Sequence, residues 1–228
     1  MMRAVRNGQA ERELYTRLTQ KYSTPKPEPH LTELIYCLTK AYYDRTAPLR
    51  VSDKETVMFA IGFGLEQVIL RGDDDTAPVS QELDGIWLTP DYVMLTGGGM
   101  DLKSTRMYPD ADGSPKRGFS ETWLEQFMGY AYLDTIEAVQ YIPDQEIPYS
   151  VGIVYLVPAE LTAWTLYFSK AELEANWAKL QVRRMVLKAH RRANTVPEPF
   201  KWNRDWECKD CRYKMRCDAW AAAQKGVA

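Results

Sequence analysis

The chain has 228 residues, of which 45% are hydrophobic, and this is enough for one domain with a real core or for such a domain with a small appendage. Its net charge of −2 excludes a strongly charged molecule, so an anionic partner such as nucleic acid would have to be bound by a local patch. No apolar run reaches the length of a membrane span and the charged start resembles no signal peptide, so we expect no membrane contact and a cytoplasmic location, in the host cytoplasm if the gene belongs to a phage.

The beginning of the chain is predicted to be helical. Residues 1–22 form a charged segment that a proline-rich stretch ends, so we expect residues 1–29 to be an N-terminal helix and linker ahead of a main domain at 30–228. Apolar residues recur at helical spacing over 31–45, which predicts a second helix with Cys37 near its middle.

A third helix is predicted to start after residue 52. Ser52 and Glu55 have the spacing of a capping box, and Gly72 follows the apolar pattern, as is typical of a helix end. Glu66 lies on this helix.

The middle of the chain favours a β-hairpin. After an acidic loop, the stretch GIWLTPDYVMLTGGGMDLKSTR at 85–106 contains two runs of β-forming residues separated by glycines. Two more strands are expected at 149–158 and 161–169, after a helix that Ser120 can cap.

The last predicted helix covers 169–194, where Ser169 and Glu172 form another capping box. The tail that follows has little periodicity and contains a cysteine-rich segment at 200–220. The order of helices, hairpin, helix, two strands and helix predicts an α/β fold with a mixed central sheet flanked by helices.

Within the predicted hairpin, acidic and basic residues are placed to converge. Asp101 and Lys103 are two residues apart on one strand and therefore share a face, and pairing around the glycines would bring Asp91 close to Asp101. Carboxylates bind hard cations such as Mg²⁺ or Mn²⁺, and a lysine beside them can orient or deprotonate a water and stabilise a phosphoryl group. An ordinary same-face pair on an exposed strand is the alternative, although three charges in an apolar strand are costly unless they are used.

The cysteines are unevenly distributed along the chain. Cys208, Cys211 and Cys217 form a C-x-x-C-x5-C pattern, and Cys37 provides a fourth thiol from far away. Four thiolates bind either Zn²⁺ or an iron–sulfur cluster, and the spacing does not choose between them. The alternative is a set of free, buried cysteines.

Taken together, these motifs resemble the PD-(D/E)xK nuclease superfamily. The segment PDYVMLTGGGMDLK matches its catalytic pattern, with Asp101 where glutamate is commoner. The RecB-like branch has a glycine followed four residues later by histidine, and here Glu66 stands in the place of that histidine. The same branch has glutamine and tyrosine four residues apart on the next helix, which Gln126 and Tyr130 match.

The resemblance, which extends over residues 30–217, implies a restriction-endonuclease-like core and a division of roles among these residues. Asp91, Asp101 and Glu66 would bind Mg²⁺ or Mn²⁺, Lys103 would position or deprotonate the attacking water, and Gln126 and Tyr130 would support the lysine or the substrate. The cysteine arrangement looks like that of RecB-family iron–sulfur nucleases, including CRISPR-associated exonucleases and phage or helicase-linked enzymes. It implies a [4Fe–4S] cluster that joins the N-terminal helix to the C-terminal tail, with structural Zn²⁺ as the alternative.

A basic stripe is a candidate for phosphate contacts. It recurs at helical spacing on the last long helix and consists of Arg184, Lys188, Arg191 and Arg192. Such a face is equally compatible with plain solvation.

The sequence therefore predicts a metal-dependent DNA nuclease that, by resemblance, acts as an exonuclease on single-stranded DNA or DNA ends. A second hypothesis is a DNA-end binding adaptor of a CRISPR adaptation or recombination complex, active only with its partner proteins. A third is a zinc-bearing structural protein without catalysis.

Overall fold

The computed structural model describes residues 29–71, 80–93, 99–137, 146–198, 205–209 and 211–225. The predicted helix at 1–22, most of the acidic loop and most of the glycine turn of the hairpin lie outside these ranges. None of the helices within them is long and apolar enough to cross a membrane.

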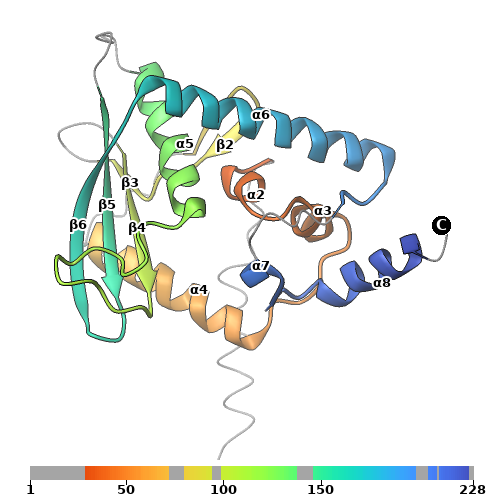
Figure 1. Cartoon of the computed structure of the whole chain (residues 1–228), viewed down its shortest axis with the longest axis horizontal. Helices are drawn as coiled ribbons and strands as arrows, with labels where there is room; N and C mark the ends of the chain where they lie inside the picture. Colours follow the sequence, from red (N-terminus) through yellow and green to blue (C-terminus); the bar gives the residue numbers. More distant parts are fainter. Residues whose placement is uncertain are drawn as a thin grey trace, which may run out of the picture.

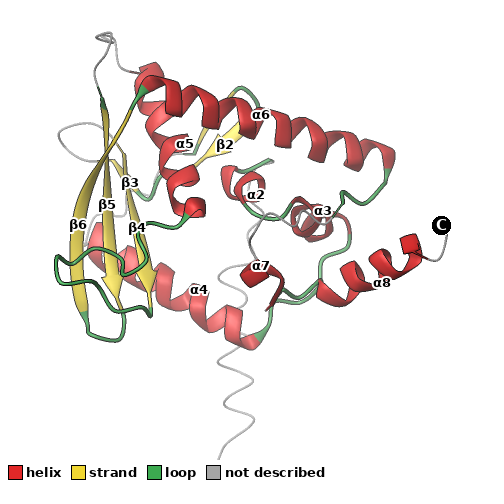
Figure 2. Ribbon diagram, in the orientation of Figure 1, coloured by secondary structure: helices red, strands yellow, loops and turns green. Residues whose placement is uncertain are grey.

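A four-stranded mixed sheet stands at one end of the molecule (Figure 2). In spatial order its strands are β3 (Tyr92–Val93), β4 (Gly99–Thr105), β5 (Ile147–Tyr155) and β6 (Glu160–Phe168). The central pair, β4 and β5, is parallel, and the two outer pairings are antiparallel. The predicted α/β fold with a mixed sheet is therefore confirmed.

Helix α5 (Glu121–Glu137) connects the two parallel strands, which need a crossover because they run in the same direction. Ser120 caps it as predicted, since its Oγ accepts a hydrogen bond from the Trp123 backbone N–H at 3.3 Å. The helix packs on one sheet face, where the rings of Phe127 and Tyr149 stack with centroids 5.9 Å apart. This face holds the predicted site.

The long helix α6 (Lys170–Ala193) lies across α5, α2 and α3 (Figure 1). Its predicted capping box is present, because Ser169 and Glu172 exchange hydrogen bonds at the first turn. Its buried side chains recur every three or four residues, which is the expected pattern for a helix with one buried face. They are Leu173, Asn176, Trp177, Leu180, Arg183 and Leu187.

The helix predicted over 31–45 is broken in two. The structure has α2 (Leu31–Ile35) and α3 (Leu38–Thr46), and the predicted apolar stripe is buried in both. At the break, the buried guanidinium of Arg183 donates hydrogen bonds to the carbonyls of Leu34 and Tyr36. A distant side chain thus replaces the bonds that a continuous helix would have made.

A short hairpin was not predicted. It pairs β1 (Gln81–Leu83) with β2 (Ile86–Leu88) around Asp84 and Gly85, both of which have positive φ. The first run of the expected long hairpin is therefore divided, since β2 pairs with β1 and only β3 pairs with β4.

Helix α4 (Asp53–Glu66) begins at the predicted capping box of Ser52 and Glu55 and continues as a π-helical turn, η1 (Gln67–Arg71). It contacts β4, and its C-terminal end meets the strands in Figure 1. All residues of α4 are described, and among them only Thr56 is fully buried, while most of the apolar side chains are half-buried.

The C-terminal tail contains two helices that the sequence analysis did not predict. They are α7 (Asp205–Lys209) and α8 (Lys214–Lys225), and they place the cysteine-rich segment near α3 and the start of α4 (Figure 1).

Candidate active site

Strand β4 presents an acid and a lysine on the same face. Asp101 is completely buried, and one of its oxygens, Oδ2, lies 2.6 Å from Nζ of Lys103, whose side chain is 16% exposed. Both face α5 because the strand alternates and Asp101 and Lys103 are two residues apart. The predicted Asp–Lys pair is thus present and desolvated, unlike an exposed same-face pair.

Asp91 joins this pair from the neighbouring strand. It precedes β3 directly, and the register that pairs Tyr92 with Met100 places Asp91 opposite Asp101 when extended by one residue. Its Oδ2 accepts a hydrogen bond from the Leu102 backbone N–H at 2.8 Å. This bond fixes the Asp91 carboxylate on β4 between the two charged residues.

Two residues of α5 complete a chain of hydrogen bonds. Lys103 Nζ donates to Gln126 Oε1 at 2.9 Å, and Gln126 Nε2 donates to Asp101 Oδ1 at 3.3 Å and to the Tyr130 hydroxyl at 3.2 Å. The Tyr130 hydroxyl in turn donates to the Thr89 carbonyl at 2.9 Å. Gln126 therefore holds the lysine and the aspartate at once, with both of its amide ends used.

Glu66 approaches the cluster from α4. It is the last residue of that helix, which packs along β4, and it is half-buried. Its charge acts on both Asp101 and Tyr130, where it opposes ionisation. The third predicted acid therefore belongs to the same electrostatic neighbourhood.

The pKa values of Asp101 and Lys103 are both raised above their ordinary values. Burial raises the pKa of Asp101 to about 7, and the negative charges of Asp91 and Glu66 add to this effect, while Lys103 opposes it. Burial alone would lower the pKa of Lys103, but the adjacent Asp101 and Asp91 outweigh it and raise that pKa. Three acids around one lysine leave excess negative charge that a bound cation would compensate.

The oxygens fit such a cation. Asp101 Oδ2 is buried, and apart from its ion pair with Lys103 it makes no hydrogen bond of regular geometry among the described atoms. A hard divalent ion binds carboxylate oxygens of this kind.

The four cysteines, although far apart in sequence, are brought to one region. Burial raises the pKa of Cys217 to about 11, and Cys37, Cys211 and Cys208 each contribute to the rise. The backbone N–H of Cys37 also donates to Glu207 Oε2 at 3.0 Å, across 170 residues of sequence. The donor set therefore has the chemistry of a thiolate metal site.

In the described part of the chain, neither the carboxylates nor the thiols are arranged as a complete metal site. Within the ranges that the structure describes, no group of three or more His, Cys, Asp and Glu side chains is arranged to hold a metal ion.

The basic stripe is not part of this cluster. Arg184, Lys188, Arg191 and Arg192 lie on the C-terminal half of α6, which extends past α3 and away from the sheet (Figure 1). Arg184 Nε donates to Gln181 Oε1 at 3.0 Å.

Two residues near the cysteines were not predicted from the sequence. Arg183 is buried at the α2–α3 break beside Cys37, and Glu207 binds the Cys37 backbone. Arg183 could have been found, because it falls on the buried stripe of α6 where an arginine is unusual. Glu207 gave no such signal.

No protein-family model and no curated protein sequence matches the chain. Among solved structures, the crystal structure of SSO0001 matches with a TM-score of 0.54 and 15% identity, over 93% of this chain and 97% of that chain. This likeness shows a shared fold. An alkaline exonuclease from Laribacter hongkongensis, LHK-Exo, matches with a TM-score of 0.33 and 9% identity over 80% of this chain and 95% of that chain.

Proposed function

We propose that the protein is a metal-dependent DNA nuclease of the PD-(D/E)xK type that hydrolyses phosphodiester bonds. The observation that carries this proposal is the buried pair of Asp101 and Lys103 on β4, with Asp91 opposite and Glu66 nearby. Buried charges of this density are costly for a fold, and they cluster where they are used.

Asp91, Asp101 and Glu66 would hold Mg²⁺ or Mn²⁺. A divalent cation bound there supplies acidity to a water and neutralises charge that develops on the phosphoryl group. The protein contributes the orientation of the carboxylates, through the Leu102 N–H to Asp91 and the Gln126 amide to Asp101.

Lys103 would hold and transfer the proton of the attacking water. In the metal-free protein the carboxylates keep its ammonium charged, and cation binding would weaken their field and lower its pKa. Gln126 aims Nζ, and Tyr130 anchors Gln126 to the Thr89 carbonyl. These two residues serve positioning roles in the proposal.

The cysteines would hold a [4Fe–4S] cluster, with Zn²⁺ as the alternative, and either would join Cys37 to the tail. Colour distinguishes the two, because iron–sulfur proteins are brown and zinc sites are colourless. Because such a site would close a long loop of the chain, its expected role is to stabilise the fold.

DNA is the proposed substrate, in the form of single strands or ends, cut exonucleolytically. Arg184, Lys188, Arg191 and Arg192 would bind phosphates of DNA beyond the cleavage site, since their helix segment points away from the sheet.

The test is cleavage of end-labelled single-stranded and duplex DNA by anaerobically purified protein with Mg²⁺, Mn²⁺ or EDTA, beside Asp101→Asn. We expect metal-dependent cleavage that EDTA and the substitution abolish, and the label that is lost would give the polarity. Folded, metal-loaded protein that cleaves neither substrate would contradict the proposal, and cleavage that appears only with partner proteins would favour the adaptor.

A further inference from the structure

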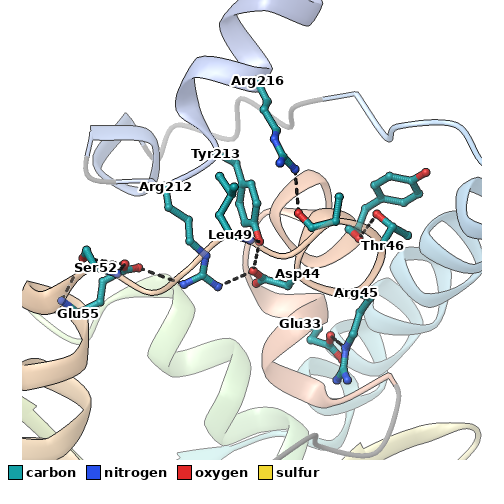
Figure 3. A network of polar contacts seen from close by, with 12 residues as sticks. Glu33, Asp44, Arg45, Thr46, Leu49, Ser52, Glu55, Arg212, Tyr213 and Arg216 are labelled. Atoms are coloured by element: carbon teal, nitrogen blue, oxygen red, sulfur yellow. Dashed lines mark hydrogen bonds and ion pairs between the residues drawn. The ribbon is translucent and has the colours of Figure 1, made fainter. Parts of the chain in front are cut away.

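The cysteine-bearing turn, defined as residues 211–217 and including the first turn of α8, contacts the start of α4 through Arg212. Arg212 pairs with Asp44 on α3 and, through its other terminal nitrogen, lies 3.6 Å from Glu55 Oε1 on α4 (Figure 3). Its side chain is 16% exposed and that of Glu55 is 24% exposed, so solvent screens these contacts only partly. Arg212, which belongs to the C-terminal segment, thus links α3 to α4.

Neighbouring contacts fix the turn itself. Tyr213 is buried, donates to Asp44 Oδ1 at 2.7 Å and accepts from the Leu49 backbone N–H at 3.2 Å. Arg216 donates to the Ala47 carbonyl at 2.8 Å (Figure 3). Arg212 therefore belongs to a segment that several hydrogen bonds hold against α3 and the loop after it.

Near its start, the contacts of α4 within the described residues include the capping box with Ser52, the side chain of Thr56 and an ion pair. Only Thr56 is fully buried along the helix, and the ion pair of Arg50 with Asp53 is largely exposed. Such an exposed pair contributes little to stability. Among the described contacts, the bridge to Glu55 is the charged contact that ties the start of α4 to the C-terminal segment.

The other end of α4 carries Glu66 to β4. Glu55 and Glu66 are about 16 Å apart along a continuous helix, which transmits a displacement of its start as a rigid rod. We infer that Arg212 is a positioning residue that, through Glu55 and α4, sets the place of the Glu66 carboxylate and so couples the cysteine-bearing turn to the active site. This inference rests on the proposed function for the role of Glu66.

Arg212→Lys and Glu55→Gln test this with little disturbance. Lysine keeps the charge but cannot span both carboxylates as the planar guanidinium does. Glutamine preserves the capping box with Ser52 while removing the charge that faces Arg212. Arg45→Met is the matched control, because Arg45 is equally buried in its 2.8 Å ion pair with Glu33 but links α2 to α3 and not to α4.

Three properties of each variant are compared with the wild type. The first is amide hydrogen exchange in residues 53–66, and the second is Mn²⁺ affinity measured by calorimetry without DNA. The third is DNA cleavage as a function of Mn²⁺ concentration, which gives the maximal rate and the Mn²⁺ concentration required. We expect both test variants to exchange faster in α4 and to bind Mn²⁺ roughly 10-fold more weakly, with the maximal rate at saturating Mn²⁺ largely restored. Cofactor content at the cysteines should stay at the wild-type level, and Arg45→Met should change neither exchange in α4 nor Mn²⁺ affinity.

Unchanged exchange in α4 would overturn the inference, as would faster exchange with unaltered Mn²⁺ affinity. A wild-type protein that neither binds Mn²⁺ nor cleaves DNA, while exchange in α4 responds to Arg212→Lys, would instead overturn the proposed function and support the Arg212–α4 link.

Discussion

At the scale of single residues, the site is defined by how little freedom its charged groups have. Asp101 is bonded to Lys103 and Gln126, and Asp91 is bonded to the Leu102 backbone, so neither carboxylate depends on water to fix it. Preorganisation of this kind removes the cost of reorganising the groups during reaction. The burial of Asp101 also makes the stability of the metal-free protein depend on pH.

The raised pKa of Asp101 predicts that this residue destabilises the metal-free protein as the pH rises. Its folded pKa of about 7 exceeds the ordinary 3.8, so the folded state binds more protons between those values and loses stability across that window. Thermal unfolding in EDTA from pH 5 to 8 should show the melting temperature of the wild type falling relative to that of Asp101→Asn. Parallel curves would contradict this, and Asp110→Asn, at an exposed position, is the control.

Gln126 should matter for rate more than for binding. Gln126→Met removes the amide that holds both Lys103 and Asp101, and we expect single-turnover cleavage to slow by roughly 10-fold to 100-fold, with Mn²⁺ affinity changed less. Gln181→Met, near the middle of α6, makes the same chemical change away from the Asp101–Lys103 pair. Because Gln181 accepts a hydrogen bond from Arg184 of the basic stripe, the rates are compared at saturating DNA, where this control should leave the rate unaltered. Equal rates for the two variants would contradict the assigned role.

At the scale of elements, local signals predicted most boundaries and long-range contacts decided the rest. The capping boxes at Ser52 and Ser169 predicted the starts of α4 and α6 correctly, because a capping box depends only on residues that lie within four positions of each other. The break at Tyr36 depends on Arg183, which is 147 residues away, so periodicity alone could not show it.

The β1–β2 hairpin is different, because its signal was present in the sequence. Asp84 and Gly85 are a common two-residue turn, and their positive φ values fit it. In the site, alternation along β4 and spacing along α5 predicted which residues share a face. The hydrogen bonds that join the two faces at Gln126 required the packing of α5 on the sheet.

Arg183 is expected to contribute strongly to stability. Arg183→Met would leave the carbonyls of Leu34 and Tyr36 without their donor in a buried place, at a cost of about 2 to 4 kcal/mol in the free energy of unfolding. Arg184→Met, its half-exposed neighbour, should cost under about 0.5 kcal/mol. Urea denaturation of both variants decides this, and similar values for the two would contradict it.

At the scale of the whole molecule, segments from both ends of the described chain meet around the cysteines. Glu207, Arg212 and Tyr213 already bind α3 and its flanks by side-chain contacts, and a metal site would strengthen that junction. A cross-link that closes so long a loop stabilises mainly by restricting the unfolded chain.

If the cysteines hold a cluster or a zinc ion, as proposed, its loss should lower stability without unfolding the protein. Removing it with a chelator, or by Cys208→Ser, is expected to lower the melting temperature by roughly 5 to 10 °C while circular dichroism keeps the helical signal. An unchanged melting temperature together with unchanged metal content after Cys208→Ser would contradict the assignment of Cys208 as a ligand.

The most direct measurement of the central claim is single-turnover cleavage of end-labelled single-stranded DNA by Lys103→Met at saturating Mn²⁺, beside the wild type. If Lys103 handles the proton of the attacking water, the rate should fall by about 1,000-fold or more, while Mn²⁺ affinity stays within about 3-fold of the wild type. Cleavage by the variant at the wild-type rate would show that the buried lysine of β4 is not part of the chemistry and that the proposed mechanism is wrong.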